Sequence, residues 1–291
     1  MAITAQDVKA LREMTGVGMM DCKKALAASD GDMDKAVEWL REKGLAASAK
    51  KAGRIAAEGM AYAGVIDGVG VVVEVNAETD FVGKNEKFVD FVKGVAATVA
   101  ACAPADLDAL MECKYNGTDL TVTQQQQEMV LVIGENIKVR RFARFAEDTS
   151  VPYIHAGGKI GVLVNLEVTG SIDVTEVGKD MAMQIAALNP RFLDKSQVTQ
   201  DVLDEEKKIL LAQMDNDPKM VSKPAQVKEK IVEGKLNKFY AENCLLQQSF
   251  VKDGDVTVEQ YMNAAAKKLG GTIVLKNAVR FEKGEGIEKK Q

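Results

Sequence analysis

The sequence predicts an α+β fold, because segments with strand alternation and segments with helical spacing follow one another along the chain. From about residue 55 the pattern is a hairpin, two helices and a strand, and a similar pattern begins at about residue 150. Tyr62 matches Tyr153 and Gly70 matches Gly161 at one constant offset, since 153 − 62 and 161 − 70 both give 91. This internal duplication predicts a core of two related subdomains with antiparallel sheets.

Composition narrows the class of protein. The chain has 291 residues, enough for two or three domains. Its net charge of −5 and pI of about 5.3 mean that no overall positive field draws it to nucleic acid or anionic lipid. The first residues lack the basic and apolar regions of a signal peptide, and no apolar run approaches membrane-spanning length. We therefore expect a cytoplasmic protein that binds neither membranes nor nucleic acid directly.

The residue types needed for metal or nucleotide chemistry are scattered. His155 is the only histidine and no C-x-x-C pair occurs, so we expect neither a metal site nor a cofactor. None of the Gly-Lys pairs at 83–84, 158–159 and 234–235 is followed by the Ser or Thr of a phosphate-binding loop. These features favour a protein that acts by contacting a partner over an enzyme. The cysteines are expected to be reduced, apolar core residues: Cys22, Cys102, Cys113 and Cys244.

Residues 1 to about 45 are expected to form three short helices. Thr4 is placed to cap the first, Met19 to Ala28 form the second, and the third runs from Met33 to Lys43, closed by Gly44. A three-helix unit of this size is typical of a docking module and is small for an enzyme. It predicts a partner-docking role for this end of the chain.

Two stretches of this region can each be interpreted in two ways. The apolar, glycine-rich turn from Gly16 to Met20 is either a surface that holds a partner helix or a tight corner between helices. The stretch from Lys43 to Arg54 is interpreted as a solvated helical linker, with a basic binding patch as the alternative. Residues 1–54 are assigned to an N-terminal partner-docking domain and linker.

The stretch from Glu74 to Lys84 is the strongest candidate for a functional site. A buried strand ends there in a polar turn that carries Asp80-Phe81, and helical spacing follows Gly83. Most aromatic side chains are core residues, so Phe81 either folds back onto the helix or serves binding from an exposed corner. The second copy continues as 168–171, Val-Thr-Gly-Ser, without an acid-aromatic pair. The fold does not require the pair, which favours function.

The strand that closes each copy is also similar, with 139–142 matching 278–281. In the first copy, basic residues interleave with two aromatic residues. This pattern is typical of one charged face on a half-buried strand, which we favour, and single-strand nucleic-acid stacking is the alternative. The residues concerned are Lys138, Arg140, Arg141, Arg144, Phe142 and Phe145.

The domain boundaries follow from the duplication and from an insertion within the second copy. Residues 55–147 are the first core subdomain, and 148–194 with 241–291 are the second. Residues 195–240 show heptad spacing on either side of a loop from Asp215 to Pro224 and predict an antiparallel coiled-coil hairpin, with additional core helix as the alternative. The charged tail from Glu282 to Gln291 is expected to fray.

Two long stretches resemble the elongation factor Ts family. They are 11–26, LREMTGVGMMDCKKAL, and 74–84, EVNAETDFVGK; the segments 134–137 and 155–164 agree as well, in order along essentially the whole chain. The resemblance implies a ubiquitin-associated-like N-terminal domain, a core of two related subdomains, and a coiled-coil hairpin inserted in the second.

The resemblance also implies guanine-nucleotide exchange on elongation factor Tu, in a 1:1 or 2:2 complex. In such proteins the corner Thr79-Asp80-Phe81-Val82 enters the nucleotide domain of the partner beside its magnesium site, and Gly16-Val17-Gly18-Met19-Met20 grips the same domain. His155 matches a contact to another domain of the partner, with a half-buried structural histidine as the rival interpretation. Other hypotheses are a chaperone or assembly subunit without exchange activity, an RNA-binding protein, and, least expected, an enzyme.

The sequence departs from the family pattern in three places. Ala77 and Gly83 are variants within the central stretch, which we expect to matter little. The chain stops soon after 284–287, where some members carry a further helix that packs on the partner, so that contact is in doubt. The loop from Asp215 to Pro224 is longer than in shorter members, which leaves the role of the hairpin open.

Overall fold

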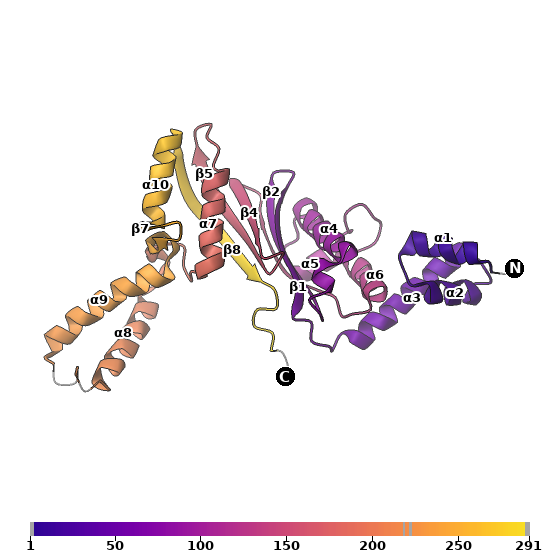
Figure 1. Ribbon diagram of the computed structural model, residues 1–291, viewed down its shortest axis with the longest axis horizontal. Coiled ribbons are helices and arrows are strands. Elements are labelled where there is room, and N and C mark those ends of the chain that lie inside the picture. The colour runs from indigo at the N-terminus through magenta and orange to yellow at the C-terminus, as the bar shows by residue number, and fades with distance from the viewer. Residues whose placement is uncertain (1–2, 218, 221–222, 289–291) are drawn as a thin grey trace. The chain divides into compact units, whose positions relative to one another are not determined.

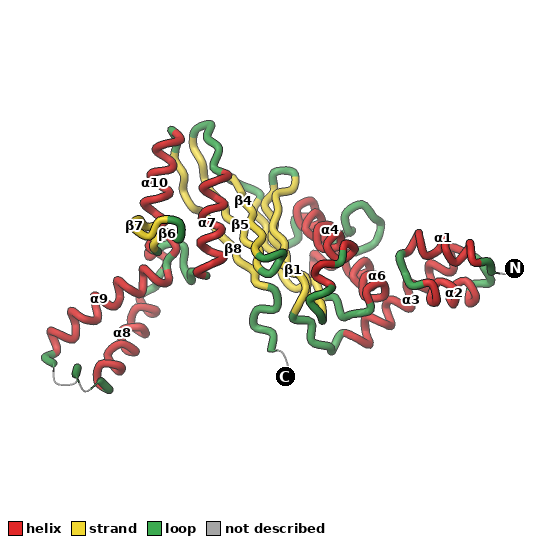
Figure 2. Tube along the Cα trace, in the orientation of Figure 1, coloured by secondary structure: helices red, strands yellow, loops and turns green. Residues whose placement is uncertain are grey.

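A computed structural model describes residues 3–217, 219–220 and 223–288 (Figure 1). Helices and strands are both abundant, which confirms the α+β prediction (Figure 2). The chain divides into two compact units. The first comprises the residues up to Glu147, Ile154–Val162 and the residues from Phe281 on; the second comprises Asp148–Tyr153 and Leu163–Arg280.

Three helices open the first unit, as predicted: α1 (Ala5–Thr15), α2 (Met19–Ala28) and α3 (Met33–Lys51). Thr4 caps α1 in a reciprocal arrangement with Asp7, and Asp32 caps α3. The helices enclose a small core of apolar side chains, which includes Leu11, Cys22, Leu26 and Leu40.

The predicted end of the third helix at Gly44 is wrong, because α3 continues to Lys51. Gly44 is buried, and a Cβ there would lie 3.2 Å from the carbonyl oxygen of Gln127 on α6 (Val122–Ile133). The glycine therefore permits close approach of two helices. The sequence alone does not distinguish this role from that of a glycine that ends a helix.

The first sheet has the order β1-β2-β3, with β1 (Glu58–Ile66), β2 (Val69–Ala77) and β3 (Lys138–Phe145). Both pairings are antiparallel. The central strand β2 is almost wholly buried, as its apolar run predicts. Two further helices of this layer are α4 (Glu86–Cys102) and α5 (Leu107–Glu112). Together with α6 they bury a core that includes Val73, Val75, Phe88, Phe91, Leu110 and Val130.

The second unit repeats this order, which agrees with the predicted duplication. Its sheet is β4-β5-β8, with β4 (Thr149–His155), β5 (Ile160–Thr169) and β8 (Thr272–Glu282). The helices α7 (Thr175–Leu188) and α10 (Val258–Leu269) accompany it. A short hairpin, β6 (Ser249–Phe250) and β7 (Asp253–Thr257), precedes α10. The sequence did not predict this hairpin.

The predicted pair of inserted helices is present as α8 (Gln200–Asp215) and α9 (Ala225–Asn243), which run side by side (Figure 2). Leu210 and Met214 of α8 pack with Val232 of α9. Within the predicted loop from Asp215 to Pro224, residues 218, 221 and 222 lie outside the described part of the chain. Single 3-10 turns occur at Val82–Lys84, Lys195–Gln197 and Leu245–Gln247.

The prediction that the tail frays from Glu282 is wrong for the described residues up to 288. The buried carboxylate of Glu74 on β2 accepts a 2.7 Å hydrogen bond from the Gly284 amide. Arg141 pairs with both Glu74 and Glu285, and Lys283 pairs with Glu58 at 2.7 Å. The tail supplies a hydrogen-bond donor to the carboxylate of Glu74, which is buried in the first unit and needs such donors. The charged sequence of the tail does not indicate this contact.

Three of the basic residues of β3 make contacts within the first unit, and two of them donate to Glu74. Arg140 donates to Glu74 at 2.9 Å, and the guanidinium of Arg141 lies 4.3 Å from the ring centre of Phe281. Arg144 donates to the carbonyl oxygen of Ala100. These internal contacts support the favoured interpretation of a half-buried strand over a nucleic-acid surface.

The prediction that all four cysteines are reduced is also wrong. Cys102 at the end of α4 and Cys113 after α5 form a disulfide, whereas Cys22 and Cys244 are free and buried. The bonded cysteines are 11 positions apart in the sequence, a spacing without a recognisable pattern. Separately, no helix among the described residues has both the length and the apolar character needed to cross a membrane.

Candidate partner-binding site

The turn after β2 exposes a large aromatic ring. Phe81 has 81% of its surface exposed, the largest fraction among the exposed large hydrophobic residues. Thr79 and Asp80 beside it are exposed as well, whereas Val82 is buried. The structure thus excludes the alternative in which Phe81 folds back as a core residue. A strongly exposed ring on a turn whose following residue is buried is a candidate for contact with a partner.

The corner is anchored on its C-terminal side. Val82 packs into the core of the first unit, and Asn85 caps α4 by accepting a 3.0 Å hydrogen bond from the Lys87 amide. Gly83 lies against β1, so that a Cβ on it would stand 2.7 Å from the carbonyl oxygen of Gly59. Gly83 therefore permits a close approach of the corner to β1 that an added Cβ would obstruct.

A hollow of about 420 Å³ lies beside the ring. Its walls include the apolar side chains of Ile55 and Phe81 and the carboxylates of Glu58, Glu78 and Asp80. Glu58 and Glu78 are engaged with Lys283 and Arg54. The corner thus combines an exposed aromatic ring with the neighbouring carboxylate of Asp80, a pairing suited to an apolar contact next to a cation.

The turn between α1 and α2 is a second exposed apolar surface. Gly16 ends α1 in the left-handed conformation, with φ of 69°, and Gly18 precedes α2. Val17 is buried, whereas Met19 and Met20 are 55% and 66% exposed. Met14, which sequence reasoning did not single out, is 60% exposed beside them. The turn is therefore a tight helical corner with exposed methionines on either side of it in the sequence, a residue type common at adaptable binding sites.

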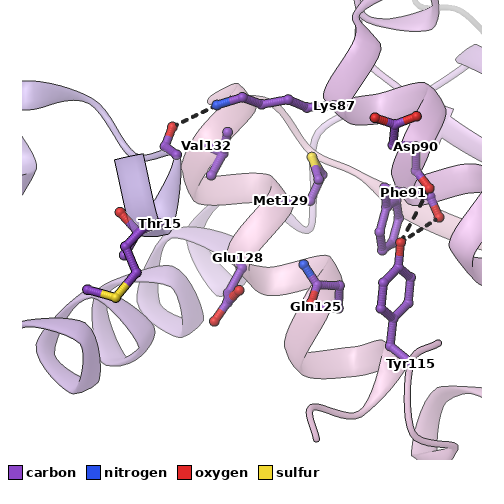
Figure 3. Close-up of a pocket in the computed structure, with 11 residues that line it drawn as sticks. Thr15, Lys87, Asp90, Phe91, Tyr115, Gln125, Glu128, Met129 and Val132 are labelled. Atoms are coloured by element: carbon purple, nitrogen blue, oxygen red, sulfur yellow. Dashed lines mark hydrogen bonds between the residues drawn. The ribbon is translucent and has the colours of Figure 1, made fainter. Parts of the chain in front are cut away.

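A hydrogen bond links this turn to the helix that follows the corner. The Lys87 ammonium on α4 donates to the Gly16 carbonyl oxygen at 3.0 Å (Figure 3). Beneath it lies a pocket of about 330 Å³ between the end of α1, α4 and α6. Tyr115 closes one side by stacking on Phe91, with ring centres 5.7 Å apart. Burial, together with the negative charge of Asp90, raises the pKa of Tyr115 to about 12.

His155 lies at the end of β4 and is exposed, which excludes the half-buried alternative. Its carbonyl oxygen accepts hydrogen bonds from the amides of Gly158 and Lys159, at 3.2 and 3.1 Å, so its position is set by the turn between β4 and β5. The structure thus links the Gly16 turn to α4, and it places His155 on a separate turn. Among the described residues, no group of three or more His, Cys, Asp or Glu side chains is arranged to hold a metal ion.

Fold and site together define a class of α+β proteins in which a small helical domain and a duplicated core carry exposed apolar side chains on anchored turns. A model of the family described as elongation factor TS matches residues 78–285. The chain belongs to the elongation factor Ts family.

Full-length relatives agree. The chain is 50% identical over 301 residues to elongation factor Ts of Trichlorobacter lovleyi, covering 100% of this chain and 96% of the relative. It is 48% identical over 295 residues to elongation factor Ts of Clostridium kluyveri, covering 99% of this chain and 95% of the relative. For elongation factor Ts of Clostridium perfringens the identity is 49% over 294 residues, with the same coverage of 99% and 95%.

Proposed function

We propose that this protein is the guanine-nucleotide exchange factor of elongation factor Tu, which binds the GDP form and accelerates GDP release. Membership of the elongation factor Ts family supports this role. The observation that carries it is the exposed ring of Phe81 beside Asp80, on a corner whose next residues are packed into the core.

In this mechanism Phe81 acts as a wedge between helices of the partner's nucleotide domain. Burying one Phe side chain contributes roughly 1.5–3 kcal/mol. Since about 1.4 kcal/mol corresponds to a factor of ten in an equilibrium constant, one ring suffices to favour a rearranged nucleotide site substantially.

Asp80, with Thr79 and Val82 framing the corner, disturbs the magnesium environment of the partner. A bound magnesium ion is the main charge that neutralises the nucleotide phosphates, so its displacement weakens nucleotide binding. Coupling between two ligands is reciprocal, and GTP therefore weakens the binding of the exchange factor in return. The factor stays bound until GTP rebinds and then leaves.

Two further surfaces contribute binding energy. The turn Gly16-Val17-Gly18-Met19-Met20 contacts the nucleotide domain, and His155 contacts a second domain of the partner. The protein works in the cytoplasm and needs no catalytic residues of its own, because all the chemistry takes place in elongation factor Tu. The complex is 1:1 or 2:2.

A chaperone or assembly subunit that binds the same partner without driving exchange is the alternative function. It needs the same exposed surfaces but leaves the rate of nucleotide release unchanged. The RNA-binding hypothesis has little support, because Arg140, Arg141 and Arg144 are engaged in contacts within the first unit.

The decisive experiment follows release of a fluorescent GDP from elongation factor Tu, with the native protein, Phe81→Ala and Leu188→Ala. Leu188 is an exposed apolar residue at the end of α7 and serves as the matched control. Strong acceleration by the native protein and by the control, with a much weaker effect of Phe81→Ala, supports the proposal. Equal acceleration by all three proteins would support the exchange function but would show that Phe81 does not act as a wedge. Binding without acceleration would favour the chaperone.

A further inference from the structure

The corner needs to be held on both sides if Phe81 is to act as a wedge. The C-terminal side is fixed by Val82 and Gly83, which pack against the core and against β1. On the N-terminal side, Glu78 and Thr79 follow the last residue of β2 and have left the ladder of the sheet. Their backbone amides are therefore free of the ladder and can donate to groups outside the sheet.

A single side chain provides them. One carboxylate oxygen of Glu135 accepts hydrogen bonds from the amides of Glu78 and Thr79, each 3.0 Å long. The other oxygen accepts from the Thr79 hydroxyl at 2.6 Å. Glu135 thus satisfies three donors of the two residues that directly precede Asp80, across a sequence separation of 56 to 57 residues. Hydrogen bonds to a charged acceptor are stronger than those between neutral groups.

The turn that carries Glu135 is itself fixed. Gly134 ends α6 in the left-handed conformation, and Asn136 and Ile137 are buried. The amide of Asn136 donates to the Glu78 carboxylate at 2.7 Å, so the two turns exchange hydrogen bonds in both directions. Arg54 adds an ion pair with Glu78 at 3.4 Å, and its carbonyl oxygen accepts from the Asn136 side chain at 2.8 Å.

From this geometry we propose that Glu135 is a positioning residue for exchange: its carboxylate holds the N-terminal side of the corner so that Asp80 and Phe81 reach the partner in one fixed orientation. The inference rests on the proposed exchange function. Glu135 does not touch nucleotide or magnesium in this scheme; it acts through Thr79. If the corner is ordered before binding, no conformational entropy has to be lost when the complex forms. A misplaced Asp80 or Phe81 should lower the rate of nucleotide release more than the affinity for the partner.

The carboxylate of Glu135 lies outside the apolar core. Thr79 is exposed and Glu135 is half-buried, so removal of the side chain leaves no cavity in the core formed by residues such as Phe88 and Phe91. We therefore expect Glu135→Ala to fold and to release only the N-terminal side of the corner. Glu135→Gln is the conservative variant, since its carbonyl oxygen accepts the two amide donors and its amide group donates to the Thr79 hydroxyl.

The experiment measures two quantities for the native protein, Glu135→Ala, Glu135→Gln and the control Glu112→Ala, an exposed carboxylate at the end of α5. The first is hydrogen exchange at the Glu78 and Thr79 amides of the free protein, followed by NMR. The second is the maximal rate of fluorescent GDP release from elongation factor Tu, together with the dissociation constant of the complex. Phe81→Ala is measured alone and combined with Glu135→Ala.

We expect Glu135→Ala to speed exchange of both amides and to lower the maximal release rate roughly tenfold, with the dissociation constant changed by less than about threefold. Glu135→Gln should restore most of the rate. In the Phe81→Ala background, Glu135→Ala should lower the release rate only slightly further, because the two residues act through the same corner.

Other results overturn the inference. If the native protein and Phe81→Ala behave as proposed but Glu135→Ala releases GDP at the native rate, Glu135 does not position the corner, and the exchange function stands. An equal loss in Glu135→Gln and Glu135→Ala, or additive losses in the double variant, would reject it too. If the native protein fails to accelerate release, the proposed function fails, and unchanged amide exchange in Glu135→Ala then rejects the ordering role separately.

Discussion

Lys87 on α4 donates a 3.0 Å hydrogen bond to the carbonyl oxygen of Gly16, 71 residues earlier in the chain. This bond ties the helix that follows the Phe81 corner to the exposed turn of the helical domain. One side chain thus connects two surfaces that the proposed function uses together.

Replacing Lys87 by Met removes the ammonium group and keeps the aliphatic stem. We expect the affinity for elongation factor Tu to fall about two- to tenfold, the range for one hydrogen bond, because the Gly16 turn loses a fixed position. Calorimetric titration measures it, with Lys93→Met, an exposed lysine on the same helix, as the control. Equal affinities of the two variants would show that this bond does not position the turn.

The Cys102–Cys113 disulfide is expected to stabilise the first unit. For a closed loop of this length, the restriction of the unfolded chain contributes about 3 kcal/mol. Urea unfolding of protein purified without reductant should therefore shift to lower urea when reductant is added. The double variant Cys102→Ser/Cys113→Ser should unfold at the reduced position in both conditions. An unchanged urea midpoint of the native protein after addition of reductant would contradict the prediction.

Stability should fall at acid pH through Glu74. Burial tends to raise the pKa of Glu74, but hydrogen bonds from Asn76, the Gly284 amide, Arg141 and Arg140 outweigh it and hold this pKa below the ordinary value of 4.5. Because the folded pKa is the lower one, the unfolded chain binds the proton more tightly. The stabilisation is complete above the unfolded pKa and is lost as the pH falls through the folded pKa.

Urea midpoints measured between about pH 6 and pH 3 test this dependence. In Glu74→Gln the acid-dependent part of the stability should be reduced. At neutral pH the free energy of unfolding should fall by roughly 3 kcal/mol, since Arg140 loses its carboxylate partner and Arg141 keeps Glu285. Glu112→Gln, with an exposed side chain, is the control. Parallel pH profiles for the native protein and Glu74→Gln would exclude Glu74 as the source.

Gly83→Ala should destabilise the first unit by about 1–3 kcal/mol and slow GDP release, because the added Cβ meets the carbonyl oxygen of Gly59 at 2.7 Å and displaces the corner. Gly234→Ala provides the opposite case. Gly234 lies within α9 with no atom within 4 Å of an added Cβ, so alanine should stabilise by up to about 1 kcal/mol. Thermal unfolding distinguishes the two; destabilisation by both variants would contradict the steric argument.

Patterns that repeat along the chain were predictable from the sequence. The duplication, the cap at Thr4 and the inserted helices each depend on residue spacing or on a residue type with one dominant use. The central strand β2 was predictable too, because a buried strand is an apolar run.

Features that depend on distant partners were not predictable. Gly44 has the signature of a helix end, and only the neighbouring α6 shows that it allows close packing. Glu135 is one acid among many in the sequence, although in the fold it accepts from two residues of the corner. Likewise, Cys102 and Cys113 come together because α4 and α5 bring them there.

The Gly284–Glu74 hydrogen bond joins residues that are 210 positions apart. During synthesis, all three strands of the first sheet are complete once Phe145 has been added, whereas the Gly284 amide that donates to Glu74 is added much later. At about 5–20 residues per second, the nascent first unit spends on the order of ten seconds in which only Asn76, Arg140 and Arg141 donate to this carboxylate. Completion of the first unit is thus a late event in the life of the nascent chain, although most of that unit is translated early.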